Sequence, residues 1–186
     1  SMHSQKIDTA KLGELILYIA SKSQDDPAFG TAKLNKILFT VDFFTYGILG
    51  HSLTNATYIR LEYSPSPREL NDVRDQLISE GRAAVQTGSY IGKPQKRLVT
   101  LAAPDMSLFS AEERALVDDL INELKPLNAT QFSTWTHTLS PWLSATDYEE
   151  IPYNTVFVMK NEPASREAMI WAINRLEELR ESGELP

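Results

Sequence analysis

Histidine is the side chain that most often serves as a general base near neutral pH, and this chain has three, at His3, His51 and His137. His3 lies in a tail, whereas His137 has hydroxyl groups on both sides, at Thr136 and Thr138. Hydroxyl residues are common, however, and the chain has no G-x-S-x-G sequence that would mark a nucleophile. An enzyme that uses His137 is therefore the third-ranked interpretation, behind two non-enzymatic ones.

Metal and cofactor sites lack their usual residues. The chain has no cysteine, and its histidines do not form a pair at the H-x-x-x-H spacing. Two pairs of adjacent acids, Asp25 with Asp26 and Glu149 with Glu150, are typical of solvated turns, because neighbouring side chains point apart in a regular element. Neither of the common glycine-rich phosphate-binding motifs is present. The sequence therefore predicts no cofactor, no metal and no enzymatic activity.

Charge is distributed unevenly along the chain, whose net charge is −7. Residues 1–100 hold 12 Lys or Arg and 10 Asp or Glu, a balance of +2, whereas residues 101–186 hold 6 and 15, a balance of −9. Overall acidity makes nucleic-acid binding an unfavoured prediction, since nucleic-acid-binding domains usually show a basic footprint. A predicted hairpin with Lys93, Lys96 and Arg97 near its tip keeps a winged-helix-like DNA-binding regulator as the second interpretation.

Length and composition fit one domain. A chain of 186 residues with 42% hydrophobic residues is long enough to bury a core of its own. No run approaches the roughly 18 apolar residues of a membrane helix, so no membrane partner is expected. The absence of cysteine suits a reducing compartment, and we expect a cytoplasmic protein. Residues 1–9 are expected to be a tail that begins with a cloning remnant, Ser1.

Apolar periodicity predicts two helices near the N-terminus. Apolar residues from Leu12 to Ile19 recur at i, i+3, i+4 and i+7, and either Asp8 or Thr9 can cap the start of this helix. A second helix is predicted to start near Thr31, its candidate N-cap, and to end at about Gly47. Its apolar residues are numerous enough to predict a central helix that is buried on more than one side.

The middle of the chain is predicted to be part strand and part helix. Alternation indicates a short extended segment at 58–63. The prolines that follow are expected to stay out of any strand ladder, because proline lacks the N–H group. Ser66 and Glu69 have the spacing of a capping box for a helix that ends at Gly81. Residues 83–102 are predicted to form a β-hairpin.

Three helices are predicted in the second half of the chain, at residues 110–126, 130–139 and 163–182. One short strand is predicted at residues 155–159. Ser110 and Glu113 have the sequence of a capping box, and Pro141 is expected to end the second of these helices. The predicted fold is mainly α within the α+β class: a compact bundle of about six helices with a small hairpin or sheet, with a winged-helix-like arrangement left open.

Four short segments form an ordered set of motifs, at residues 33–39 with Asp42, 63–67, 136–142 and 151–153. In order and spacing they resemble the K-L-x-K-L-L-Y…D-F, Y-G-P-V-P, S-H-x-x-x-P-W and I-P-Y motifs of the Panacea domain, also called the SocA-like antitoxin domain. Ser64 stands where the family usually has glycine. If that position needs a positive φ, the turn is strained by about 1 kcal/mol. The resemblance covers residues 10–160, and residues 161–186 are expected to add a helix packed on the same domain.

The resemblance implies an interaction protein. It would be an antitoxin that binds and neutralises a partner toxin, or a proteolytic adaptor that delivers the toxin to a Clp-type protease, and some members are phage-associated. No oligomeric state is implied. The candidate partner-binding residues, carried over from the motifs, are Lys33, Lys36, Asp42, Tyr63, Pro65, Pro67, His137, Pro141, Trp142, Pro152 and Tyr153. For the set as a whole, we favour a role in holding the fold together.

Overall fold

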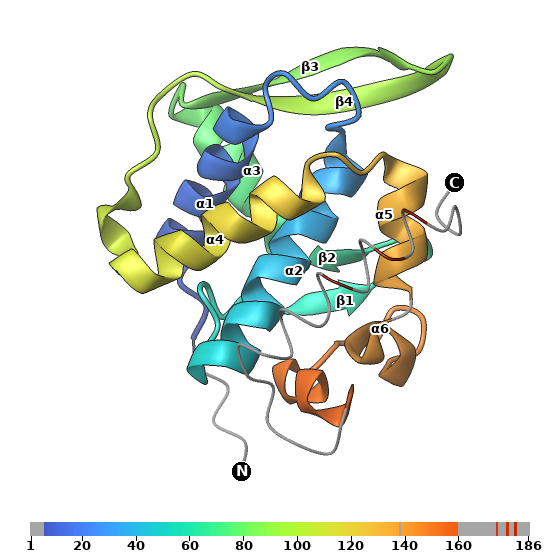
Figure 1. Ribbon diagram of the computed structural model, residues 1–186. Helices are drawn as coiled ribbons and strands as arrows, with labels where there is room; N and C mark the ends of the chain where they lie inside the picture. The colour runs from blue at the N-terminus through green and yellow to red at the C-terminus, as the bar shows by residue number, and fades with distance from the viewer. Residues whose placement is uncertain (1–5, 138, 160–173, 175–177, 179–180, 182–186) are drawn as a thin grey trace.

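The computed structural model describes residues 6–137 and 139–159, together with the isolated positions 174, 178 and 181. Six α-helices and four strands lie in this part of the chain (Figure 1). In chain order the elements are α1 (Thr9–Lys22), α2 (Thr31–Leu49), β1 (Tyr58–Arg60), β2 (Pro65–Pro67), α3 (Leu70–Ser79), β3 (Ala83–Tyr90), β4 (Lys93–Thr100), the 3-10 helix η1 (Met106–Leu108), α4 (Ala111–Leu124), α5 (Ala129–Thr136), α6 (Ser140–Ser144) and the 3-10 helix η2 (Tyr153–Met159). The helix predicted at 163–182 lies almost wholly outside the described residues.

Helix α2 is the centre of the fold, as predicted. It contacts α1, α4, α5, β2 and η2, and residues on all of its sides are buried (Figure 1). Its ends differ from the prediction, because Gly30 rather than Thr31 is the N-cap and the helix continues past Gly47 to Gly50, whose left-handed φ of 82° ends it. Helix α1 is capped by Asp8, whose carboxylate accepts a hydrogen bond from the Lys11 amide at 2.9 Å. The apolar pattern therefore predicted both helices correctly.

Strands β1 and β2 form a small antiparallel sheet in which both prolines lie, contrary to the prediction. Pro67 pairs with Tyr58 and Pro65 with Arg60. The flanking amide of Arg68 donates to the Thr57 carbonyl at 2.7 Å, so the alternation of an antiparallel ladder places both prolines at its non-hydrogen-bonded positions. The missing N–H groups therefore face away from β1, and prolines are tolerated at such an edge.

The other side of β1 is bonded to the chain after α6. The Arg60 amide donates to the Glu149 carbonyl at 2.9 Å, and the Ile151 amide donates to the Tyr58 carbonyl at 2.8 Å. The predicted strand at 58–63 is thus shorter than expected, and it is the middle of three extended segments. This arrangement joins the Y-S-P-S-P motif to the region of the I-P-Y motif.

Helix α3 begins three residues later than predicted. Ser66 is part of β2, and Glu69 is the N-cap, although its side chain makes no capping bond. The Glu69 carboxylate instead accepts from the Thr57 amide, at 3.1 and 3.2 Å from its two oxygens. The capping-box prediction was wrong here because Glu69 satisfies a donor on the neighbouring segment.

Strands β3 and β4 confirm the predicted hairpin. They pair from Ala83 with Thr100 to Tyr90 with Lys93, and the two turn residues, Ile91 and Gly92, both have positive φ. The hairpin lies against α1, α2 and α3 (Figure 1). Four strands make the fold α+β rather than all-α, and a winged-helix arrangement stays a prediction.

The elements predicted in the second half of the chain are confirmed in part. The capping box of α4 is present, since Ser110 accepts from the Glu113 amide at 3.1 Å and Glu113 accepts from the Ser110 amide at 2.8 Å. Pro141 does not simply end a helix, because it lies in the first turn of α6, where proline's lack of an N–H costs nothing. The strand predicted at 155–159 is instead part of the 3-10 helix η2.

Candidate functional site

Asp42 forms the central buried polar cluster of the molecule. Its side chain is fully buried on α2. One oxygen accepts from the amides of Leu53 and Thr54 at 2.8 and 3.1 Å, and the other accepts from the Thr54 hydroxyl at 2.7 Å and the Tyr58 hydroxyl at 2.6 Å. Burial raises the pKa of Asp42, and these four donors oppose that shift because they stabilise the carboxylate. Asp42 therefore fixes the 50–58 loop against α2.

Two tyrosines complete this cluster. Burial raises the pKa of Tyr58 well above its ordinary value, which keeps the hydroxyl protonated as a donor to Asp42. Tyr153, from the I-P-Y motif, donates to the Ala56 carbonyl at 2.6 Å, and its ring lies 4.7 Å from the Phe43 ring, centroid to centroid. Burial also raises the pKa of Tyr153. The cluster thus ties the motif of α2 to that of η2 and has a fold-holding role.

Lys33 holds the other end of α2. Its buried ammonium group lies 2.5 Å from an Asp26 carboxylate oxygen and also donates to the carbonyls of Lys125, at 2.7 Å, and Leu127. These carbonyls follow the C-terminal end of α4, where a cation is favourable. Burial lowers the pKa of Lys33, and the ion pair with Asp26 opposes that shift. The ammonium group of Lys33 is therefore bonded to groups of the protein itself.

Lys36 lies one turn further along α2 and is equally buried, with 2% of its surface exposed. In the described part of the chain, no hydrogen bond or ion pair to its ammonium group is found within bonding distance. Burial and the nearby charge of Lys33 lower its pKa to about 8. The two lysines of the motif therefore have different environments despite their shared helix edge.

Arg60 organises a second group of motif residues around Trp142. Its guanidinium carbon lies 4.4 Å from the centre of the Trp142 ring, and the His137 ring stacks on the same indole at 4.5 Å with an interplanar angle of 16°. Arg60 Nη1 donates to the carbonyls of Trp142 and Ala145, at 2.9 and 2.6 Å. This group joins β1 to the turn between α5 and α6.

Exposed apolar residues directly follow Arg60 and Trp142 in the chain or are linked to this group through their backbone. We call them the aromatic surface, which consists of Leu61, Tyr63, Leu143 and Tyr148, and these are 37%, 71%, 63% and 69% exposed. Tyr148 is bonded to Arg60 through its amide, at 2.6 Å from the Arg60 carbonyl, and has a positive φ of 66°. A left-handed tyrosine is costly, and such strain is concentrated at functional sites.

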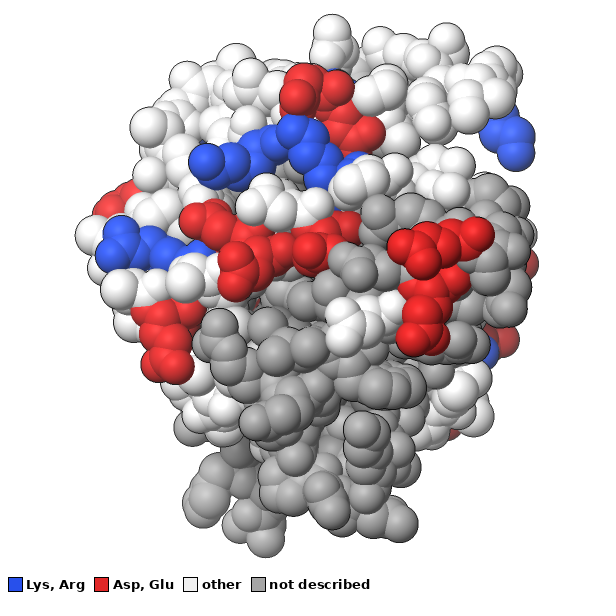
Figure 2. Space-filling model, in the orientation of Figure 1, with Lys and Arg blue, Asp and Glu red and all other residues white. Residues whose placement is uncertain are grey.

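Acidic residues flank the residues of the aromatic surface along the chain. Glu62, Asp147, Glu149 and Glu150 are all exposed and adjacent to it in the chain. Glu62 raises the pKa of Tyr63 through a side-chain hydrogen bond. Acidic side chains also gather over α4 on the face shown in Figure 2, where Glu112, Asp118, Asp119 and Glu123 lie on that helix. Both regions favour a basic partner over a polyanion.

The basic hairpin has less free charge than its sequence indicates. The Arg97 guanidinium donates to the carbonyls of Phe29, at 3.1 Å, of Gln24, at 3.1 Å, and of Asp26. Arg97 is thus held by the 24–29 loop, and the exposed cations of the hairpin are Lys93 and Lys96. This geometry weakens the physical argument for a DNA-binding wing.

His137 lies in a packing environment. Ser133 Oγ is 3.5 Å from His137 Nε2, which is long for a hydrogen bond, and it is also 3.5 Å from the Tyr63 carbonyl. Burial lowers the pKa of His137, so the stacked ring is neutral near pH 7. This arrangement adds no support to the interpretation of His137 as an enzymatic base.

The motif residues therefore divide into three groups. Asp42 and Tyr153 meet in one cluster, whereas Tyr63, His137 and Trp142 meet in another, and Lys33 lies apart from both. Pro65, Pro67 and Pro141 are buried and shape the chain, whereas Pro152 is exposed. Among the residues that the structure describes, the positive-φ residues other than glycine are Asn55, Ile91 and Tyr148, so Ser64 does not carry the strain considered above.

Sequence reasoning missed several residues that join these groups. Asp26 and Thr54 lie in loops, where a carboxylate or hydroxyl carries no signal of a distant partner. Arg60 lay on the polar side of an alternating segment, and Leu143 followed Trp142 without any distinguishing pattern. Tyr148 belongs to none of the four motifs, and its exposure came only from the structure.

The fold and the site define a small α+β protein that holds an exposed aromatic surface on a framework of buried polar clusters. The family model of the SocA-like antitoxin, Panacea domain, matches residues 34–143, more than half of the 186-residue chain. The protein therefore belongs to the SocA-like antitoxin family of Panacea-domain proteins. Comparisons with curated proteins and with solved structures found no match.

Membrane-spanning helices and metal sites are both absent from the described residues. None of the helices in this part of the chain is both long and apolar enough to cross a membrane. Over the same residues, no group of His, Asp and Glu side chains has the arrangement of a metal site.

Proposed function

We propose that this protein is an antitoxin that neutralises a basic toxin protein by binding it directly through the aromatic surface. The observation that carries the proposal is the exposure of Tyr63, Leu143 and Tyr148 together, beside the motif residues of the family. Tyrosine anchors with a rigid support are typical of binding hot spots. Arg60 and Trp142 supply that support, because both are held by the contacts described above.

Charge supports the choice of a basic partner. The acids around the aromatic surface attract a cationic protein and accelerate its association. A toxin that acts on RNA or ribosomes is basic for the same reason that any RNA-binding protein is, since it must neutralise phosphates. An acidic antitoxin that covers such a surface competes directly with the RNA. Neutralisation by masking follows without any chemical step.

The test compares binding and toxicity for three versions of the chain. The wild type, a surface variant (Tyr63→Ser, Leu143→Ser, Tyr148→Ser) and a control variant (Val85→Ser, Leu101→Ser) are used to capture proteins from lysate of the source organism. Val85 and Leu101 are exposed apolar residues outside the aromatic surface, 42% and 61% exposed. The captured protein is then expressed alone and together with each version.

We expect one stoichiometric partner that is toxic alone and harmless with the wild type or the control. The surface variant should bind it at least about tenfold more weakly, because each lost hot spot costs 1–2 kcal/mol or more. Circular dichroism should show that the surface variant remains folded. A captured partner that is not toxic, or one that binds the surface variant as tightly as the wild type, would contradict the proposal.

A further inference from the structure

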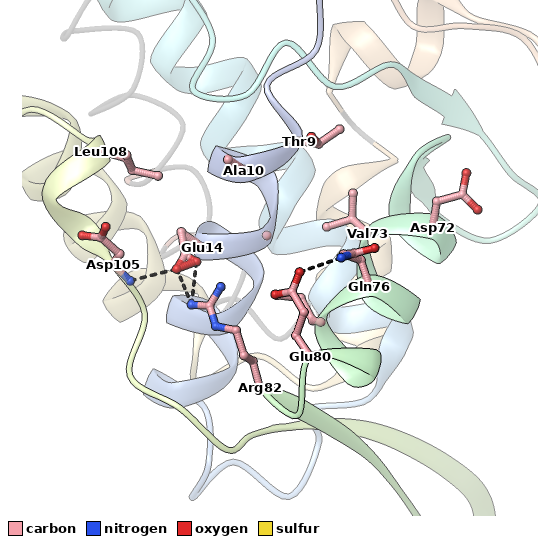
Figure 3. A pocket seen from close by; sticks show the side chains of 12 residues that line it. Thr9, Ala10, Glu14, Asp72, Val73, Gln76, Glu80, Arg82, Asp105 and Leu108 are labelled. Carbon is pink, nitrogen blue, oxygen red and sulfur yellow. Dashed lines mark hydrogen bonds and ion pairs between the residues drawn. The ribbon is translucent and has the colours of Figure 1, made fainter.

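A groove lies between α1 and α3, on a different part of the molecule from the aromatic surface (Figure 3). It has a volume of about 610 Å³. Ala10 and Gly13 of α1 and Val73 and Leu77 of α3 give it an apolar floor, and Leu108 adds an apolar side. The groove therefore offers a place for an apolar side chain.

The edges of this groove are acidic. Four carboxylates line it, those of Glu14, Asp72, Glu80 and Asp105, against one guanidinium, that of Arg82. Figure 3 shows Arg82 turned towards Glu14, with which it forms an ion pair that includes a 2.9 Å contact. Glu14 also accepts from the Asp105 amide at 3.1 Å. The charges left over are therefore negative, at Asp72, Glu80 and Asp105.

The tip of the β3–β4 hairpin has the opposite properties. Ile91 is the most exposed of the large apolar residues described, at 77%, and it holds a left-handed φ of 49°. A β-branched residue in this conformation is a strained exception, and asparagine or glycine would form the turn at lower cost. Lys93 follows the turn directly, pairs with Tyr90 and is exposed. The tip thus presents an apolar side chain together with a cation.

We propose that the hairpin tip of one copy of this protein inserts into the α1–α3 groove of a second copy. Ile91 would occupy the apolar floor, and Lys93 would face Asp72, Glu80 and Asp105. The groove needs an apolar group accompanied by positive charge, and the exposed tip of the same chain supplies both. This inference concerns a different face from the proposed toxin contact and does not depend on it.

The tip and the groove are different surfaces, so each contact between copies is heterologous. Two copies that exchange hairpins close into a dimer with two such contacts, whereas unclosed exchange gives larger assemblies. One tip buries less surface than a standard interface, so we expect weak association that is strongest at low ionic strength.

The test is the association of the full chain, measured by sedimentation equilibrium up to sub-millimolar concentration, at about 0.05 M and about 0.5 M salt. The tip variant (Lys93→Glu) and the groove variant (Asp72→Lys, Glu80→Lys) should each raise the dissociation constant at least about tenfold. A chain that carries all three reversals should recover association, because opposite charges meet again. The control variant (Asp119→Lys, Glu123→Lys) changes the same net charge on α4 and should associate as the wild type does.

Ile91→Gly separates strain from contact. It relieves the left-handed conformation and should leave the fold intact, yet it should weaken association because the apolar side chain is lost. A wild type that is monomeric under all these conditions overturns the proposal. So does a combined tip-and-groove variant that fails to recover association, or an Ile91→Gly variant that associates as well as the wild type.

Discussion

The Asp42 cluster and the aromatic surface contain residues of the same family motifs, but they differ in burial. The polar groups of the cluster are buried and hydrogen-bonded, whereas the apolar groups of the surface are exposed. Around Asp42, four donors satisfy one fully buried carboxylate. On the aromatic surface, Tyr63 and Tyr148 leave about 70% of their area exposed to water (71% and 69%). A buried, satisfied cluster stabilises the fold, whereas exposed aromatic area has no stabilising role in an isolated chain.

The residues of one set of motifs therefore have different roles. Tyr63 and Asp42 are both motif residues, yet replacing one should alter binding and replacing the other should alter folding. Arg60 and Trp142 lie between these extremes, because they are largely buried but directly support exposed neighbours.

The largest effect is expected for Asp42→Ala. The substitution leaves the donors from Leu53, Thr54 and Tyr58 without an acceptor in the core, and it should lower the free energy of unfolding by roughly 4–5 kcal/mol. Urea unfolding followed by circular dichroism measures this change. Asp119→Ala, on the exposed side of α4, is the control and should change the free energy by less than about 0.5 kcal/mol. A loss below about 1 kcal/mol for Asp42→Ala would show that the cluster does not hold the fold.

The two motif lysines should respond differently to the same substitution. Lys33→Met leaves Asp26 buried beside two carbonyls that lose their donor, and it should lower the free energy of unfolding by roughly 3 kcal/mol. Lys36→Met removes a buried cation that has no hydrogen-bond partner among the described residues, so it should be neutral or stabilising by about 1 kcal/mol. The same urea titration measures both. Equal losses for the two variants would refute this division.

The pH dependence of stability gives a smaller and more specific test. Burial lowers the pKa of Lys36 to about 8 in the folded protein, from an ordinary value of 10.5. Between these values the unfolded chain binds more protons, so the contribution of Lys36 to the free energy of unfolding rises with pH. The wild type should therefore gain on the order of 1–3 kcal/mol relative to Lys36→Met between about pH 7.5 and pH 10. A difference that is flat over this interval would mean that Lys36 is solvated in the folded protein.

Local sequence signals predicted the elements whose causes are local. The apolar period of α1 and α2, the Ser110–Glu113 capping box and the glycine-containing turn of the hairpin were all confirmed. Ser66 was misjudged because Glu69 bonds to Thr57 on another segment. The two prolines of β2 were misjudged because their tolerance depends on which side of the strand meets a partner.

The candidate site shows the same limit. Motif resemblance predicted its residues as a set, but not which of them are buried. Tyr148 and Leu143 become part of one surface only because Arg60 joins β1 to the chain after α6. Contacts of this kind connect residues more than 80 positions apart, as in the bond from Arg60 to the Trp142 carbonyl. No periodicity within a single segment contains that information.

The sequence by itself determined the helical core, the hairpin, the acidic character and the family, because these depend on residue types and short spacings. Tertiary structure alone decided that the charged groups of Asp42 and Lys33 are bonded within the protein and that Lys36 is buried without a described partner. It also decided that Tyr63 and Tyr148 are exposed to water. The physical reason is that burial and hydrogen-bond partners are properties of packing between distant segments. Chemistry at each residue is set by those neighbours rather than by its place in the chain.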